Sequence, residues 1–179
     1  QRLYYRYRSS VATLTVITML PLVTGEESPI LCQKTQLVTD PLSPEIQELL
    51  PKMIKTMHKE HGVGLAAPQI NIPLRLAVAE VENKQYFFIN PEITSRSQDT
   101  IISEEGCLSL PGEFFPILRS ETVTLRYVNE KGLPKKMRAT GFLATVIQHE
   151  VDHLDGVLIL HRYLKQEKKQ KNTSYDSLA

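Results

Sequence analysis

The chain has 179 residues, a formal net charge of +1 and two cysteines. This length predicts one domain that buries its own core, and two cysteines are too few for a disulfide framework. The near-neutral net charge gives no argument for nucleic-acid binding, and a hydrophobic content of 41% excludes a disordered chain. The cysteine count instead indicates a reducing compartment or a ligand role.

The charge is unevenly distributed, with two basic ends around an acidic centre. Residues 1–20 contain three arginines and no acid, and residues 161–179 contain five lysines and arginines against two acids. The apolar stretch behind the first arginines is too short to span a bilayer, although its outline resembles a targeting peptide. We expect residues 1–19 to be a targeting leader or a fragment, residues 20–164 to form the folded domain, and residues 165–179 to be a disordered basic tail.

The first predicted helix starts after Ser43, which is a typical N-cap residue. Apolar residues then follow at helical spacing over 46–57. Pro51 lies inside this pattern and predicts either a kink or a later helix start, because proline disrupts a helix interior.

Strands and a second helix follow. Alternating apolar residues and turn signals predict strands at 74–81, 86–89, 121–129 and 137–139. The residues at 141–154 are mostly apolar and are predicted to form a second helix. Separated helices and sequential strands of this kind predict an α+β fold with mostly antiparallel sheets.

The most informative segment has the sequence QHEVDH and lies in the second helix, at 148–153. Four-residue spacing places His149 and His153 on one helix face, where two imidazoles can bind one metal ion. Glu150 lies beside them, where its carboxylate can act on a water at that ion. The alternative is a pair of surface histidines, which the apolar character of this helix disfavours.

A catalytic metal site of this type needs a third protein ligand. The extended zinc-protease motif would place a histidine at position 159, where this chain has Ile159. Later carboxylates lie directly after the helix or near the polar tail, so we expect the ligand upstream. Cys107, in the segment EGCLS, is the best candidate, whereas Cys32 lies in an unremarkable context and is interpreted as structural.

A third segment, GVGLAAPQ at 62–69, combines two glycines with other small residues. Such a segment lets the backbone approach a ligand or another chain closely. It lacks the lysine and hydroxyl residue of a phosphate loop. In isolation it predicts a tight turn that ends at Gln69, whose amide can donate a hydrogen bond.

Together and in this order, GVGLAAPQ, EGCLS and QHEVDH resemble the three motifs of the peptide deformylase family. The resemblance covers roughly residues 20–164 and implies a catalytic domain in which antiparallel sheets surround a central helix that carries both histidines. It implies a hydrolase that removes the N-formyl group from the initiator methionine of nascent polypeptides and releases formate.

The resemblance also implies which residues perform the reaction. Cys107, His149 and His153 would bind one divalent metal ion. A water activated by this ion would attack the formyl carbon, with Glu150 as general base and then general acid. The resemblance implies iron(II) as the native ion, with zinc, nickel or cobalt also accepted.

Further residues of the motifs would assist. The backbone N–H of Leu108 and the side chain of Gln69 would stabilise the oxyanion, and Gly64 would pair with the substrate backbone. Arg119 lies where the family has an arginine that supports Glu105.

We also expect a hydrophobic pocket for the methionine side chain, lined partly by Val63, Leu108, Phe142 and Val146. Positions 142 and 146 are four residues apart, one turn ahead of the two histidines.

The implied partners are formyl-methionyl nascent chains, with a transient ribosome contact through the basic tail; neither DNA nor a membrane is an expected partner. A bacterial-type cytoplasmic location is expected, or an organelle if residues 1–19 are a transit peptide. Two alternatives stay open at this point: an inactive or repurposed metal-binding relative, and a zinc metalloprotease.

Overall fold

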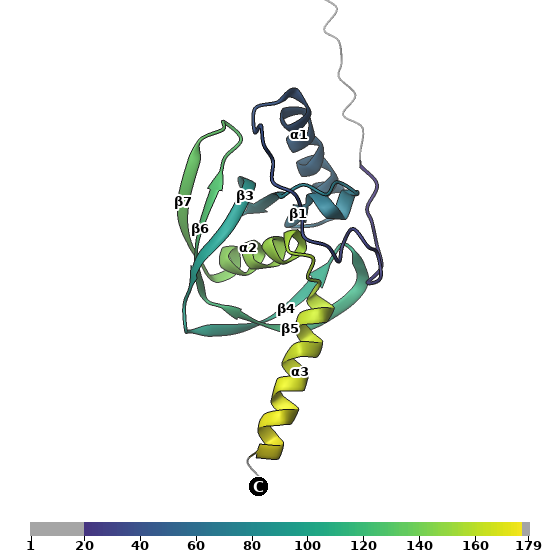
Figure 1. Cartoon of the computed structure of the whole chain (residues 1–179), viewed down its shortest axis with the longest axis vertical. Helices are drawn as coiled ribbons and strands as arrows, with labels where there is room; N and C mark the ends of the chain where they lie inside the picture. Colours follow the sequence, from purple (N-terminus) through teal and green to yellow (C-terminus); the bar gives the residue numbers. More distant parts are fainter. Residues whose placement is uncertain (1–19, 177–179) are drawn as a thin grey trace, which may run out of the picture.

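The computed structural model describes residues 20–176. The leader predicted at 1–19 and the last three residues of the predicted tail therefore lie outside the described residues. Helix α1 (Pro44–Lys59) comes first, and helices α2 (Gly141–Leu154) and α3 (Ile159–Asp176) come after the strands (Figure 1). Within residues 20–176, each helix is either too short or too polar to cross a bilayer.

The strands form two antiparallel sheets. The larger has the order β1-β2-β3-β6-β7, and the smaller pairs β4 with β5. Their bounds are β1 (Gly64–Ala66), β2 (Leu76–Val81), β3 (Lys84–Arg96), β4 (Thr100–Cys107), β5 (Leu110–Ser120), β6 (Thr122–Val128) and β7 (Pro134–Thr140). A short 3-10 helix, η1 (Ala67–Ile70), follows β1.

Helix α2 lies in the centre, with the five-stranded sheet on one side and the β4–β5 hairpin on the other (Figure 1). Its residues from Ala144 to Leu154 are mostly buried because both sheets cover them. The predicted α+β fold with antiparallel sheets around a central helix is therefore confirmed. The alternative of two surface histidines is wrong, since His153 is buried and His149 is half-buried.

Helix α1 starts where its cap predicts. The Ser43 side chain accepts a hydrogen bond from the N–H of Ile46, and Pro44 occupies the first turn. The helix runs through Pro51, so the expectation that Pro51 marks a later start is wrong. Its apolar face packs on β1 and β2 beside the start of the GVGLAAPQ segment.

Two parts of the structure were not expected from the sequence. One is the long β4–β5 hairpin, whose end is the stretch 104–112. Helix α3 continues to Asp176, where a disordered tail was expected from Lys165. Contacts with β5 explain the helix, since the Tyr163 ring packs against Phe115 and Gln166 hydrogen-bonds the β5 backbone.

Candidate metal centre and active site

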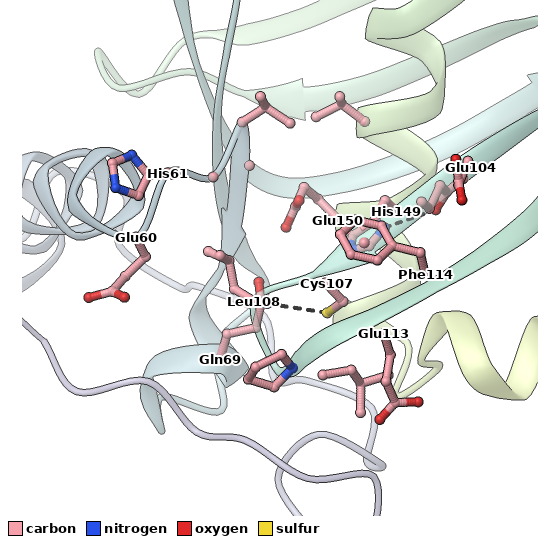
Figure 2. Close-up of a pocket in the computed structure, with 18 of the residues that line it drawn as sticks. Glu60, His61, Gln69, Glu104, Cys107, Leu108, Glu113, Phe114, His149 and Glu150 are labelled. Atoms are coloured by element: carbon pink, nitrogen blue, oxygen red, sulfur yellow. Dashed lines mark hydrogen bonds and ion pairs between the residues drawn. The ribbon is translucent and has the colours of Figure 1, made fainter.

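A cavity of about 710 Å³ lies between the GVGLAAPQ segment, the tip of the β4–β5 hairpin and helix α2. All five residues predicted to contact substrate line it: Val63, Gly64, Leu108, Phe142 and Val146. Cys107, His149, Glu150 and Gln69 line the same cavity (Figure 2). The tertiary structure therefore brings the three sequence motifs to one place.

Cys107, His149 and His153 form the cluster that can hold a metal ion. Their ligand atoms all lie within 4.8 Å of one another, and Cys107 Sγ is 3.2 Å from His153 Nε2. Cys107 ends strand β4, whereas the two histidines lie one turn apart on α2. A thiolate with two imidazoles is a donor set that binds zinc and other divalent transition metals, and three protein ligands leave a position open.

The orientation of His149 supports this fit. Its Nδ1 lies 2.9 Å from Glu105 Oε2, and a hydrogen bond donated by Nδ1–H would leave Nε2 as the free ligand atom. Cys32 is exposed, its thiol donates to the Glu26 carbonyl, and it takes no part in the cluster found among the described residues.

The electrostatics of the site favour positive charge at the cluster. Burial by itself lowers the pKa of His149, but hydrogen bonds with Cys107 and Glu105 and the nearby Glu150 charge raise this pKa to about 10. A metal cation in the same place would meet the same negative surroundings. Burial, the charge on His149 and then Arg119 lower the pKa of His153, which keeps this imidazole neutral, as a metal ligand must be.

Glu150 is a buried carboxyl beside the cluster. Burial raises its pKa to about 7, and the largest opposing effect is the attraction of His149. One carboxylate oxygen, Oε2, is fully buried and has no hydrogen-bond partner among the described residues. A buried acceptor of this kind is rare in native proteins unless it serves a ligand or a reaction.

Gly64 makes room for this carboxyl. A Cβ built on Gly64 would lie 2.8 Å from Glu150 Cδ and would collide with Oε1 as well. Strand β1 is also an edge strand, because β2 covers only one of its sides. An extended peptide can therefore add to its open side, where the cavity lies.

The amide of Gln69 has a fixed orientation. Its Oε1 accepts a hydrogen bond from the Ala66 N–H at 2.8 Å, which turns Nε2 toward Ser109 Oγ at 3.3 Å and Cys107 Sγ at 3.8 Å. The NH₂ group consequently faces the cluster. Leu108 follows Cys107 in the turn between β4 and β5 and lines the same cavity.

Behind the cluster lies a network of buried ion pairs. Arg119 donates to both oxygens of Glu105, from Nε at 2.6 Å and from Nη2 at 2.7 Å, and its Nη1 lies 2.5 Å from Asp152 Oδ2. Burial by itself raises the pKa of Glu105, but the hydrogen bonds from Arg119 and His149 lower it to about 2. Glu105 is thus an anion that lies against Arg119, as the family resemblance implied, and it also contacts His149, which was not expected from the sequence.

Two members of this network, Asp152 and Arg162, were assigned no role from the sequence. Asp152 accepts hydrogen bonds from Arg119 and from both Nε and Nη2 of Arg162. The available signal was Asp152 itself, a second acid beside Glu150 on a largely apolar helix, because a buried carboxylate needs a cationic partner. Arg162 carried no local signal, since it stands among other basic residues near the end of the chain.

A His-Glu-x-x-His helix with a buried acid beside three candidate metal ligands is the arrangement typical of one class of proteins, the metal-dependent hydrolases. A family model described as polypeptide deformylase matches residues 19–170. Since this match covers most of the chain, the chain belongs to the polypeptide deformylase family.

Individual relatives agree with this assignment. The chain is 44% identical over 134 residues to the peptide deformylase of Prochlorococcus marinus, covering 71% of this chain and 66% of the relative. It is 44% identical over 141 residues to that of Dictyoglomus thermophilum, covering 79% of this chain and 91% of the relative. The match thus spans slightly less than two thirds of the Prochlorococcus marinus relative and nearly all of the Dictyoglomus thermophilum one.

Solved structures show the same fold. The crystal structure of peptide deformylase from Thermotoga maritima matches with a TM-score of 0.78 and 39% identity, covering 81% of this chain and 97% of that one. A Met-Ala-Ser-bound class I type b peptide deformylase from Acinetobacter baumannii matches with a TM-score of 0.78 and 32% identity, covering 81% and 98%. Membership of this family counts against the zinc metalloprotease alternative, as does the burial of Ile159 in the core.

Proposed function

We propose that this protein removes the N-formyl group from formyl-methionine at the start of nascent polypeptides, releasing formate and a free amino terminus. One observation carries the proposal: a Cys/His/His cluster and a buried carboxyl share one cavity with a glutamine amide, in a chain of the deformylase family. An inactive metal-binding relative would have no need to keep Glu150 and Gln69 in this arrangement.

Cys107, His149 and His153 are the proposed ligands of one divalent metal ion. When bound, such an ion supplies Lewis acidity and lowers the pKa of water to near neutrality. Iron(II) is the native ion that the family resemblance favours, and the same donors suit zinc, nickel or cobalt. Glu105 holds the ring of His149 through Nδ1, so that Nε2 faces the centre.

Glu150 is the proposed general base and acid. With a pKa raised to about 7 by burial, its carboxylate can accept a proton near neutral pH and return it to the leaving amine. Gly64 leaves the space that this side chain needs.

Gln69 and Leu108 are the proposed oxyanion donors. The formyl carbon becomes tetrahedral during the attack and its oxygen gains negative charge. The Gln69 Nε2–H₂ group is held toward Cys107 before substrate arrives, so little reorganisation is needed in the transition state. The N–H of Leu108 would be the second donor, from the turn that follows Cys107.

Substrate recognition is proposed to use two surfaces. The backbone of the peptide would add to the open edge of β1 at Gly64. The methionine side chain would enter the apolar part of the cavity, formed by Val63, Leu108, Phe142 and Val146.

An anaerobic assay with formyl-Met-Ala-Ser, combined with metal analysis of the protein, tests the proposal. We expect release of formate in proportion to bound metal. Acetyl-Met-Ala-Ser should be a poor substrate, and formyl-Asp-Ala-Ser should react far more slowly than the methionine peptide. Metal-loaded protein without formate release would support the inactive relative, and cleavage of internal peptide bonds would support a protease.

The partner and location are also proposals. Lys165 and Lys168 are exposed on α3, whose far end projects away from the sheets (Figure 1), and they supply positive charge for a transient contact with ribosomal RNA. We propose that the protein acts in a bacterial-type cytoplasm, as its bacterial relatives suggest, or in an organelle if residues 1–19 are a transit peptide. Residues 20–164 with the adjoining α3 would form the catalytic unit.

A further inference from the structure

An unbroken series of charged contacts joins the candidate metal centre to the C-terminal helix. His149 Nδ1 pairs with Glu105, Glu105 with Arg119, Arg119 with Asp152, and Asp152 with Arg162 on α3. The first four residues lie on β4, β5 and α2, and two of them, His149 and Glu105, line the cavity. Arg162 alone comes from the helix that follows.

Arg162 completes the charge balance of this network. Glu105 and Asp152 are two buried acids, with side chains 5% and 8% exposed, and Arg119 is a single buried cation with 1% exposure. Arg162, at 36% exposure, adds the second positive charge from the rim. When His149 is a neutral metal ligand, Glu105 and Asp152 would otherwise share the single cation of Arg119 in a poorly solvated place, which is unfavourable.

The geometry shows how loss of this charge would reach His149. Asp152 Oδ1 accepts from Arg162 Nη2, and Oδ2 accepts from both Arg162 Nε and Arg119 Nη1. If Arg162 were absent, Asp152 would draw Arg119 toward itself. The two hydrogen bonds from Arg119 to Glu105 would then weaken, and Glu105 would orient the His149 ring less firmly.

Helix α3 is anchored independently of this contact. Gln166 accepts from the Leu118 N–H at 2.9 Å and donates to the Pro116 carbonyl at 3.1 Å, so it pairs with the free edge of β5. The Tyr163 and Phe115 rings lie 5.2 Å apart. A change at Gln166 therefore disturbs the docking of α3 without touching the charged series.

We propose that Arg162 is a positioning residue for the metal centre: from α3 it holds Asp152 and thereby, through Arg119 and Glu105, sets the orientation of the His149 imidazole. The inference deepens the proposed function, since it assigns a part of the catalytic unit to a helix outside the three motifs. It concerns metal binding directly, so it can be tested without substrate.

The test compares Arg162→Ala with Gln166→Ala in cobalt(II)-loaded protein, whose visible absorption reports ligand geometry. We expect Arg162→Ala to release the metal to a chelator about tenfold faster, near the lower end of the 10- to 100-fold range for groups that orient metal ligands. Its visible spectrum should shift. Gln166→Ala should leave both the release rate and the spectrum unchanged, although it loosens α3.

Two further variants separate positioning from general stability. Arg162→Lys should restore part of the slow metal release, because one ammonium can replace part of the guanidinium contact. In a Glu105→Gln background, Arg162→Ala should not increase the release rate further, because the contact through which Arg162 acts on His149 has already been weakened. Equal effects of Arg162→Ala and Gln166→Ala, or additive effects with Glu105→Gln, would overturn the proposal.

These outcomes are distinguishable from failure of the proposed function. If metal release changes as expected but formyl peptides are not hydrolysed, the positioning role of Arg162 stands and the activity does not. If Arg162→Ala is unfolded, the milder Arg162→Lys and Arg162→Gln variants supply the comparison. Unchanged metal release in folded Arg162→Gln would then count against the proposal. For active protein, we expect kcat to fall with little change in KM, because the substrate cavity is not lined by Arg162.

Discussion

The Cα of Gly64 faces the side chain of Glu150, and any side chain at position 64 would occupy the place of that carboxyl. We expect Gly64→Ala to displace Glu150 and to lower kcat about 100-fold, the scale on which misplacement of a catalytic group by about 1 Å acts. Steady-state kinetics with a formyl-Met peptide measures the loss. Metal content should stay at the parent level, because position 64 contributes no ligand atom. A Gly64→Ala protein with parental kcat would show that Glu150 does not need its present position.

Replacement of Glu150 separates metal binding from catalysis. Glu150→Ala and the isosteric Glu150→Gln should keep the metal and lower kcat roughly 100- to 10,000-fold, the range expected for loss of a general base. Metal analysis and a formate assay on the same samples provide both readings. Substantial residual activity in Glu150→Gln would remove this residue from the role of base.

The pH dependence of the reaction follows from the same group. A base must be deprotonated, so kcat/KM should fall as the pH drops below the pKa of Glu150, which is about 7 without metal. A bound cation favours the carboxylate, so the acid limb of the loaded enzyme should lie below pH 7. A profile whose acid limb is unchanged in Glu150→Asp would assign the limb to another group.

Cys107 is the proposed ligand that would distinguish this centre from those with nitrogen and oxygen donors alone. Cys107→Ser should bind the metal more weakly, because a hydroxyl is a poorer donor than a thiolate for these ions. Competition with a chelator measures the affinity, and Cys32→Ser provides the matched control, since Cys32 is exposed and outside the cluster. Equal affinities of the two serine variants would exclude Cys107 as a ligand.

The ion pairs of Glu105 make the free energy of unfolding depend on pH in the acid range. Its pKa is lowered to about 2 in the folded protein from an ordinary value of 4.5, so the folded state favours the carboxylate. The resulting stabilisation is present above pH 4.5 and is lost as the pH falls from 4.5 toward 2. Urea unfolding of metal-free protein between pH 2 and 6 should show this slope, and Glu105→Gln should flatten it. An identical slope in both proteins would place the acid sensitivity elsewhere.

Some elements were predictable because their signals are local. The cap at Ser43, the period of α2 and the alternation of the predicted strands follow from nearest neighbours along the chain. The β4–β5 hairpin was missed because its outward residues Ile102, Phe114 and Leu118 are exposed and apolar, which obscures the usual alternation. The helical continuation from Lys165 was missed because its support comes from contacts with β5 rather than from an apolar face of its own.

The chemistry of the candidate site can be deduced from the amino-acid sequence: the residue types present, the two histidines that share a helix face, and the family whose motifs these are. Those properties depend on spacing within short segments. The long-range contacts come from the tertiary fold: Cys107 lies beside His153, Gly64 makes room for Glu150, and α3 supplies Arg162 to a buried acid. Contacts of this kind join residues that are far apart in the chain. Whether each buried charge finds a partner and each side chain finds space is settled only when the core packs.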